Sequence, residues 1–196
     1  MSYYFKTENK LKDQDIKIDF IFQGYSFSFR SNSGIFSKDK VDQGSHFLLQ
    51  YLAENDLKGH LLDIGCGYGL FGVVLSKIKP ELLVTMVDIN ERAVEMAKLN
   101  CQLHEVKCWV LVSNICENVE NKFDYVISNP PIRAGKQVVF DIIKQAKERL
   151  NDKGQLFLVI RKKQGALSAL NYASKIFNSS EIVERHKGYW IIKSIK

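Results

Sequence analysis

The sequence predicts an α/β protein with a mostly parallel, seven-stranded sheet whose last strand is antiparallel, preceded by an N-terminal β-hairpin. From residue 61 onward, short apolar runs typical of strands alternate with longer segments of helical periodicity. Strands joined by right-handed helical crossovers give this rhythm. Near the end, Lys187-Gly188 separates two strand-like segments and is typical of a two-residue hairpin turn. We therefore expect six strands in one direction and a reversed final strand.

The N-terminal hairpin is expected because apolar and polar residues alternate over 16–22 and again over 25–29. Gln23-Gly24 between them favours a tight turn. A helix then follows at 45–53, where the apolar spacing is helical and Asp42 or Ser45 can cap the first turn. The remaining expected elements are strand 61–64, helix 70–78, strand 82–87, helix 91–103, strands 107–112 and 123–127, helix 136–150, strand 155–160, helix 164–177, and strands 181–186 and 189–195.

Length and composition bound the class of protein. The 196 residues with 45% hydrophobic content suit a single domain, 1–196, with a hairpin-and-helix extension at 1–58 and the core at 59–196. Charges interrupt every apolar stretch, and the first residues lack the order of a secretory signal, so we expect no membrane segment and a cytoplasmic protein.

The cysteines do not suggest a metal site. Cys66, Cys101, Cys108 and Cys116 form no Cys-x-x-Cys pair, and no histidine lies at metal-ligand spacing. We expect reduced thiols and no metal; zinc is the alternative, although the paired spacing of structural zinc sites is missing.

The net charge of +6 is concentrated at the C-terminal end. Residues 151–196 hold 9 Lys and Arg against 3 Asp and Glu, while the two charge types balance over the rest of the chain. A basic segment suits a polyanionic partner, and a solvated surface is the alternative explanation.

The first chemical motif is a glycine turn between the strand at 61–64 and the helix at 70–78. It consists of Gly65, Cys66, Gly67, Tyr68 and Gly69. Backbone N–H groups at such a helix start can face a ligand, and a dinucleotide pyrophosphate is one candidate. Asp63, just before the turn, would repel a pyrophosphate but suits an ammonium group, directly or through water.

Two neighbouring strand ends extend this site. Asp88 and Ile89 follow the strand at 82–87, where an Asp can accept both ribose hydroxyls of a nucleoside. Asn114 and Ile115 follow the next strand and offer an amide and an apolar side chain to an adenine edge and face. An ammonium-bearing amino acid joined to adenosine describes S-adenosylmethionine, which these residues favour over a nicotinamide dinucleotide.

The second chemical motif is Ser128-Asn-Pro-Pro131, which ends another apolar strand. A ring-conjugated exocyclic amine is a poor nucleophile, so its site must accept hydrogen bonds from its N–H groups. Asn129 Oδ1 and the Pro130 carbonyl can accept them, while Pro130 and Pro131 keep the loop rigid. Because both motifs end strands of one sheet, we expect them to meet at its carboxyl edge and to support methyl transfer to an amine.

These motifs resemble known enzyme families. The glycine turn with Asp63 and Asp88 is similar to class I S-adenosylmethionine-dependent methyltransferases, and Asn129-Pro-Pro131 to the Asn/Asp/Ser-Pro-Pro-aromatic motif of amino methyltransferases. With the segment 34–45, the chain looks like a small stand-alone relative of the RsmC-type 16S ribosomal RNA guanine-N2 methyltransferases. The resemblance implies a Rossmann-like class I fold and N-methylation of an exocyclic amine of an RNA base, with guanine N2 of 16S rRNA as the expected target.

The resemblance also implies further contacts. In that family the loop corresponding to 34–45 lies over the cofactor, which implies that Phe36, Asp42 and Gly44 are near it, as is Asn129. Ile132 replaces the aromatic residue and would cover the base by apolar contact. A solvated connection is the alternative for the loop.

Cations at the same edge suit an RNA backbone beside a flipped base. They are Arg133 and Lys136 after the Asn-Pro-Pro turn, and Arg161, Lys162 and Lys163 after the strand at 155–160. Tyr189-Trp190 is expected to pack the last strand onto the sheet, although an exposed aromatic ring can stack on a base.

Two other functions stay open at this point. A protein-glutamine methyltransferase uses the same Asn-Pro-Pro chemistry, and an RNA-binding module can keep the cofactor fold without catalysis. RNA, as ribosomal RNA or a ribosomal subunit, is the expected partner, and the sequence leaves the oligomeric state open.

Overall fold

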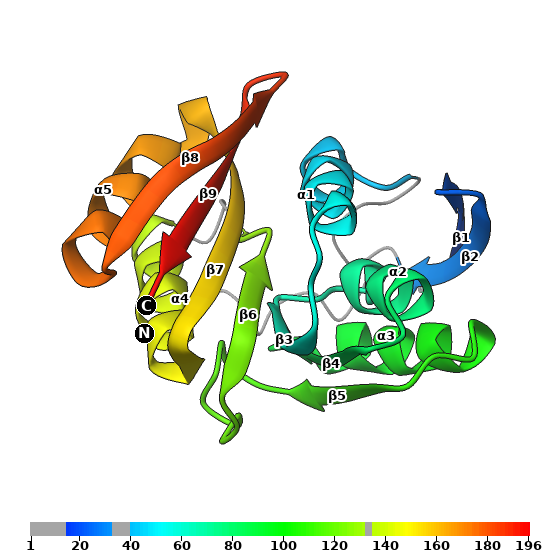
Figure 1. Ribbon diagram of the computed structural model, residues 1–196. Coiled ribbons are helices and arrows are strands. Elements are labelled where there is room, and N and C mark those ends of the chain that lie inside the picture. Colours follow the sequence, from blue (N-terminus) through cyan, green and yellow to red (C-terminus); the bar gives the residue numbers. More distant parts are fainter. Residues whose placement is uncertain (1–14, 33–39, 132–134) are drawn as a thin grey trace.

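The computed structural model describes residues 15–32, 40–131 and 135–196. Figure 1 shows a large twisted sheet with helices on both faces and a separate small hairpin. The elements are β1 (Asp15–Phe22), β2 (Tyr25–Asn32), α1 (Gln43–Glu54), β3 (Gly59–Ile64), α2 (Leu70–Ile78), β4 (Leu82–Asp88), α3 (Glu91–Leu103), β5 (Cys108–Val112), β6 (Phe123–Ser128), α4 (Lys136–Arg149), β7 (Leu150–Arg161), the 3₁₀ turn η2 (Lys162–Gln164), α5 (Ala166–Ile176), β8 (Ser179–His186) and β9 (Tyr189–Ile195).

The large sheet has the strand order β5-β4-β3-β6-β7-β9-β8. The pairs among β3 to β7 are parallel, and β9 is antiparallel to both β7 and β8. Six strands therefore run in one direction and only β9 is reversed, as the sequence predicts. Both predicted two-residue turns are present, since Gln23-Gly24 and Lys187-Gly188 have positive φ throughout.

Two hydrophobic clusters cover the two faces of the sheet. Helices α1, α2 and α3 pack with the hairpin on one face, and α4 and α5 pack on the other (Figure 1). Successive strand residues alternate between the clusters: Leu61 belongs to the first and Leu62 to the second, and both are fully buried. The predicted α/β fold with an N-terminal hairpin is confirmed.

Two of the differences from the predicted boundaries have a clear physical reason. The strand expected at 155–160 spans Leu150–Arg161, because the backbone becomes extended at Leu150, directly after α4, and Leu150 pairs with Phe123. The helix expected at 164–177 is broken at its start, because Gly165 takes a φ of 100° between η2 and α5. A left-handed residue cannot continue a helix.

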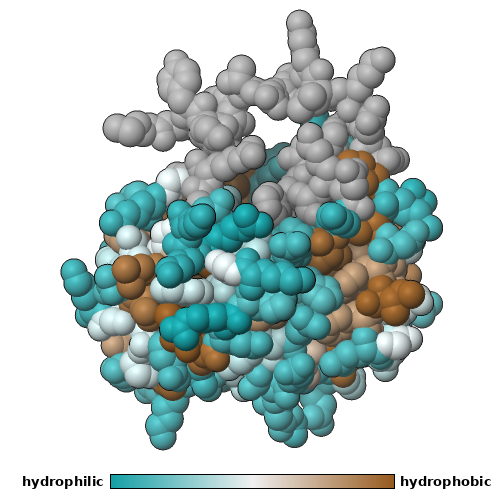
Figure 2. Space-filling model, turned by 90° about the horizontal axis from the view of Figure 1, so that it is seen from above, coloured by the Kyte–Doolittle hydropathy of each residue, from teal (hydrophilic) through white to brown (hydrophobic). Residues whose placement is uncertain are grey.

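In Figure 1, β6 and β8 point towards the top of the molecule while β5 runs across the view, and Figure 2 shows the molecule from above. Hydrophilic side chains dominate the left part of this view, over α5, β8 and β9, with smaller apolar areas between them. Among the described residues, no helix combines the length and apolarity needed to cross a membrane.

Candidate active site

The two motifs leave adjacent strands at the same edge. β3 and β6 are parallel neighbours with Asp63 opposite Ile127, so the glycine turn and the Asn-Pro-Pro loop begin side by side. The buried Ser128 hydroxyl donates a hydrogen bond of 2.7 Å to the carbonyl of Ile64. This bond ties the last residue of β6 to the last residue of β3, immediately before each motif.

The first three N–H groups of the glycine turn are bonded within the protein. The N–H groups of Gly65 and Cys66 both donate to the Val87 carbonyl, at 2.8 and 3.0 Å, and Gly67 N–H donates to Asp88 Oδ2 at 2.9 Å. These donors stabilise the turn against the end of β4 instead of facing a ligand. The N–H groups of these three residues are therefore not free to bind a pyrophosphate, whereas the expectation for the N–H groups at the helix start stays a prediction.

Close packing explains why the turn has a glycine at Gly69 and a small buried side chain at Cys66. Gly69 begins α2 at a φ of 90°, and a Cβ there would lie 3.1 Å from the Cβ of Ala97. Cys66 is buried and its thiol lies 3.7 Å from the Gly67 carbonyl. Burial raises the pKa of the Cys66 thiol well above its usual range, and nearby acids add to the shift. Its side chain is a neutral part of the core.

Asp63 is a buried carboxyl group without a hydrogen-bond partner. It is 1% exposed, and neither carboxylate oxygen has a partner among the described residues. Burial raises the pKa of Asp63 well above its ordinary value of 3.8, and the charge of Asp88 raises it further. An ammonium group would supply both the missing hydrogen bonds and the opposite charge, which is what the amino-acid end of S-adenosylmethionine offers.

The predicted nucleoside contacts lie along the ends of β4 and β5. Asp88 is half-buried, and its Oδ1 accepts from the Asn90 N–H at 2.9 Å, which fixes the carboxylate at the edge. Ile89 is 41% exposed beside it. Asn114 is exposed, with its amide donating to Glu117 Oε1 at 2.7 Å, and Ile115 is half-buried in a left-handed conformation. These residues lie at the ends of β4 and β5, and their contacts with a ribose and a base stay a prediction.

The side chain of Asn129 is held by the start of α1. Asn129 Nδ2 donates to Asp42 Oδ1 at 3.2 Å and to Ser45 Oγ at 3.0 Å, and its distance to Asp42 Oδ2 is 3.5 Å. Asp42 is the N-cap of α1, so one of the two predicted caps is confirmed. Pro130 is buried and Pro131 is exposed. The amide oxygen of Asn129 is left on the side away from Asp42.

Gly44 lies against the last strand. A Cβ on Gly44 would lie 2.8 Å from Tyr189 Cε1, so only glycine fits between α1 and β9 without movement. Tyr189 is half-buried and packs against the α1–α3 cluster, as the sequence predicts. The contact fixes the start of α1, and with it Asp42, relative to the sheet.

The predicted RNA-contacting cations divide between the two faces of the sheet. Arg161 lies over the Tyr189 ring at 4.7 Å, on the face of α1. Lys162 lies 6.0 Å from the Trp190 ring centre, on the face of α4 and α5, and Arg185, a cation outside the predicted set, lies 5.5 Å from the same ring. Arg161, Lys162, Lys163, Arg185 and Lys187 are all exposed. They form a cationic rim around the turn between β8 and β9.

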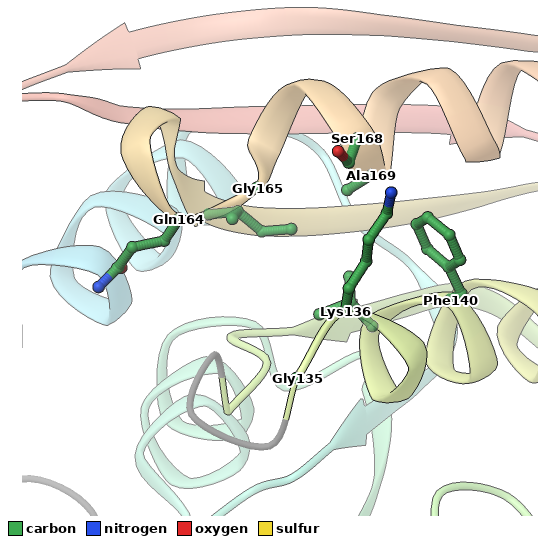
Figure 3. A pocket seen from close by; sticks show the side chains of 9 residues that line it. Gly135, Lys136, Phe140, Gln164, Gly165, Ser168 and Ala169 are labelled. Carbon is green, nitrogen blue, oxygen red and sulfur yellow. The ribbon is translucent and has the colours of Figure 1, made fainter.

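Lys136 contributes to a separate hollow between α4 and α5. Its ammonium lies 5.1 Å from the Phe140 ring centre, and Figure 3 shows both side chains facing Ser168 across the gap. The hollow measures about 100 Å³, and its lining includes none of Asp63, Asp88 and Asn129. It is too small for a nucleoside cofactor, whose pockets start at about 300 Å³.

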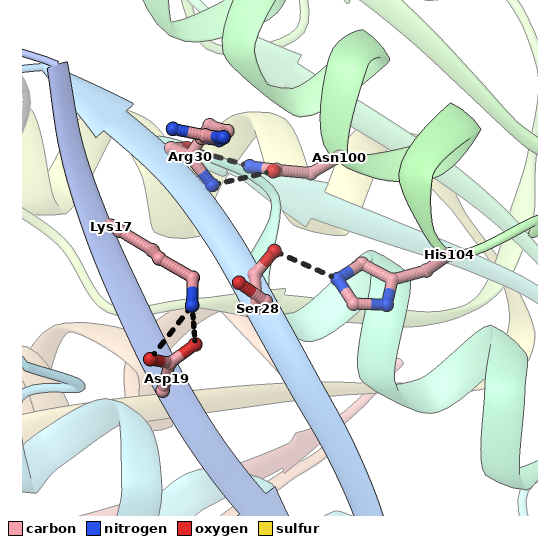
Figure 4. A network of polar contacts seen from close by, with 6 residues as sticks. All are labelled: Lys17, Asp19, Ser28, Arg30, Asn100 and His104. Carbon is pink, nitrogen blue, oxygen red and sulfur yellow. Dashed lines mark hydrogen bonds and ion pairs between the residues drawn. The ribbon is translucent and has the colours of Figure 1, made fainter.

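The N-terminal hairpin is anchored to the glycine turn through Asn100 on α3. The buried Asn100 amide donates to the carbonyls of Arg30 and Tyr68 and accepts from the Arg30 N–H, each at 2.8 Å. His104 Nε2 lies 3.3 Å from the Ser28 carbonyl in the same contact (Figure 4). One side chain thus links β2, α3 and the cofactor side of the edge.

The structure therefore brings together Asp42, Gly44, Asp63, the glycine turn, Asp88 and Asn129, while Lys136 lines the hollow between α4 and α5. Phe36, Ile132 and Arg133 are outside the described residues. Sequence reasoning missed the contact of Ser45 with Asn129 and the role of Asn100. Both are long-range pairings, with Ser45 and Asn129 separated by 84 positions in the sequence, and no local pattern signals them.

The described residues contain no group of three or more His, Cys, Asp or Glu side chains that could bind a metal. All four cysteines are free thiols.

Residues 26–193 match the family described as methyltransferase small domain. The chain belongs to this family. With its seven-stranded fold and the fit of its edge to the cofactor, it is an S-adenosylmethionine-dependent methyltransferase of class I.

Related proteins fall into two groups by length. The uncharacterized protein YbxB of Bacillus subtilis is 37% identical over 99% of this chain and 98% of its own length. Ribosomal RNA small subunit methyltransferase C of Photorhabdus laumondii is 34% identical over 83% of this chain but only 48% of its own. The chain spans about half of the methyltransferases C that it matches.

The solved structure of the T. thermophilus 16S rRNA N2 G1207 methyltransferase (RsmC), in complex with AdoMet and guanosine, has the same fold. It superposes with a TM-score of 0.83 at 24% identity, covering 92% of this chain and 50% of that one.

Proposed function

We propose that this protein transfers a methyl group from S-adenosylmethionine to an exocyclic amine of an RNA base, with guanine N2 of 16S rRNA as the target. The observation that carries the proposal is the Ser128–Ile64 hydrogen bond of 2.7 Å. It joins the strand ends from which the cofactor motif and the amine motif leave, so a methyl donor and an amine bound at the two motifs would meet.

The chemistry follows from the donors and acceptors present. S-adenosylmethionine supplies an electrophilic methyl group on a sulfonium. Asn129 Oδ1 and the Pro130 carbonyl accept hydrogen bonds from the amine and orient its nitrogen for in-line attack. The new N–CH₃ bond forms as the S–CH₃ bond breaks, the sulfonium becomes a neutral thioether, and the surplus N–H proton leaves to water. Asp63 and Asp88 bind and orient the donor and take no part in proton transfer.

An RNA acceptor is supported by the relatives and by charge. The curated relatives of known name act on ribosomal RNA, and the structural relative was solved with guanosine. The cationic rim, consisting of Arg161, Lys162, Lys163, Arg185 and Lys187, lies at the end of β7 and the β8–β9 turn, on the same sheet edge as Asn129. Phosphates would contact these side chains with little dependence on sequence.

The test is methyl transfer from radiolabelled S-adenosylmethionine to three acceptors: naked 16S rRNA, small ribosomal subunits lacking the modification, and total protein. RNA from cells without the protein serves as substrate, and nucleosides are analysed by mass spectrometry. The proposal expects label in N2-methylguanosine from one of the two RNA acceptors. Label in glutamine, in a different nucleoside, or in nothing would overturn it.

A further inference from the structure

We propose that Asp42 and Ser45 are positioning residues that fix which end of the Asn129 amide faces the substrate amine. The inference deepens the proposed function and rests on it, because that function needs an acceptor at this position. The contact that carries it joins α1 to the end of β6.

The chemistry of the partners allows only one orientation of the amide. A carboxylate has no hydrogen to donate, so the group of Asn129 that faces Asp42 must be Nδ2. Ser45 Oγ accepts from the same nitrogen, and both amide hydrogens are thereby assigned. Oδ1 must then point to the opposite side. Turning the amide over would place two oxygen acceptors against each other and leave both unsatisfied.

The two positioning side chains are themselves rigid. Asp42 Oδ1 accepts from the N–H groups of Gly44 and Ser45 at 3.0 and 3.1 Å, as the N-cap of α1. Ser45 is buried at 7% exposure, and Gly44 is wedged against Tyr189. The orientation of Asn129 is therefore set by a helix start 87 residues earlier in the chain.

The fixed orientation determines what the site can bind. An exocyclic amine presents only N–H groups in the plane of its ring and needs acceptors. A reversed Asn129 side chain would point its own N–H groups at the N–H groups of the amine. Asp42 prevents this reversal and so keeps the Asn129 oxygen facing the amine as an acceptor. The orientation of Asn129 aligns the bound amine, so a change in that orientation should alter kcat more than it alters cofactor affinity.

A charge-swap series tests this directly. Asp42→Asn keeps a good N-cap but replaces Asp42 Oδ2, which lies 3.5 Å from Asn129 Nδ2, with an NH₂ group. This new donor favours the reversed orientation of the Asn129 amide. Asn129→Asp places two carboxylates together. In the double variant, the new amide at position 42 donates to one oxygen of the new carboxylate at position 129, whose other oxygen accepts from the amine. We expect kcat to fall by about tenfold or more in each single variant and to recover most of that loss in the double variant.

The control is Asp56→Asn, which removes the same charge from an exposed residue beyond the other end of α1 and should leave kcat unchanged. KM for S-adenosylmethionine should change less than kcat in all variants. Full activity of Asp42→Asn, or a double variant slower than both single ones, would overturn the proposal.

A second readout does not depend on activity. The side-chain amide resonances of Asn129, assigned by their loss in Asn129→Ala, should shift in Asp42→Asn and in Ser45→Ala but not in Asp56→Asn. Unchanged resonances would refute the positioning role. If the wild-type protein methylates no RNA, the proposed function fails, while these resonances still decide whether Asp42 and Ser45 orient Asn129.

Discussion

The edge has two halves that are built in different ways: a cofactor half with Asp63, the glycine turn and Asp88, and an acceptor half with Asn129, Asp42 and Ser45. The cofactor half comes from consecutive strands, β3, β4 and β5, and backbone hydrogen bonds to Val87 and Asp88 hold its turn. The acceptor half joins segments far apart in the chain, with Asn129 bonded to Asp42 and Ser45, and Gly44 packed on Tyr189. The halves should therefore fail separately: damage to the first should reduce cofactor binding, and damage to the second should reduce turnover.

The largest expected effect is on turnover in Asn129→Ala. Losing an aligned hydrogen-bond acceptor should lower kcat by about 100-fold or more. Affinity for S-adenosylmethionine should stay within about twofold, because the cofactor half remains intact. Calorimetry and single-turnover transfer measure the two quantities. Asn178→Ala, an exposed asparagine at the other end of the sheet, is the control. A matching fall in cofactor affinity would show that Asn129 is also needed for cofactor binding and would contradict the separation of the two halves.

Asp63→Asn should give the opposite result. Cofactor affinity should fall by about 10- to 100-fold through loss of a charged hydrogen bond, while the cofactor-free protein becomes more stable. The stability gain follows from the raised pKa of Asp63. Because the folded protein retains a proton that the unfolded chain loses, wild-type stability falls as pH rises from 3.8 through that raised pKa.

Two pH series check the prediction for Asp63. Wild-type affinity for S-adenosylmethionine should rise with pH over the same window, because the ammonium binds the ionised carboxylate. Thermal melting should show Asp63→Asn above wild type at neutral pH, and calorimetry should show that its cofactor affinity has lost this pH dependence. A variant less stable than wild type would mean that Asp63 has a partner in the cofactor-free protein.

Gly44→Ala tests the packing that supports the acceptor half. The added methyl would lie 2.8 Å from Tyr189 Cε1, and such overpacking costs about 1–3 kcal/mol. The melting temperature should fall by about 2–4 °C per kcal/mol, and kcat should fall with it. Gln43→Ala, an exposed neighbour, is the control. In a Tyr189→Leu background the same substitution should cost less; an equal cost would refute the clash.

The smallest effect is expected at the cationic rim. Lys162→Ala should raise KM for RNA at low salt and reduce the dependence of log affinity on log salt by about 0.7, the value for one single-strand phosphate contact. Lys175→Ala, an exposed lysine at the other end of α5, removes the same charge as a control. Equal effects of both variants would indicate a general charge effect and no contact at the rim.

The same division explains what the sequence could predict. The strand directions and the positions of Asp63 and Asp88 at strand ends follow from local patterns, because periodicity, glycine turns and strand-terminal acids lie within short windows. The pairing of Asn129 with Ser45 does not, because it depends on how α1 meets β6. The bonded N–H groups of the turn were missed because their acceptors, the Val87 carbonyl and the Asp88 carboxylate, lie on the next strand. The start of α5 was predicted at 164 and lies at Ala166, because Gly165 takes a left-handed conformation that the helical pattern does not reveal.

The most direct test of the account is single-turnover transfer from labelled S-adenosylmethionine, with cofactor binding measured in the same samples, for wild type, Asp63→Asn and Asn129→Ala. We expect wild type to bind the cofactor and methylate RNA, Asn129→Ala to bind it without transfer, and Asp63→Asn to bind it weakly but transfer once saturated. Loss of both properties in Asn129→Ala, or tight binding by Asp63→Asn, would contradict the assignment of the two halves.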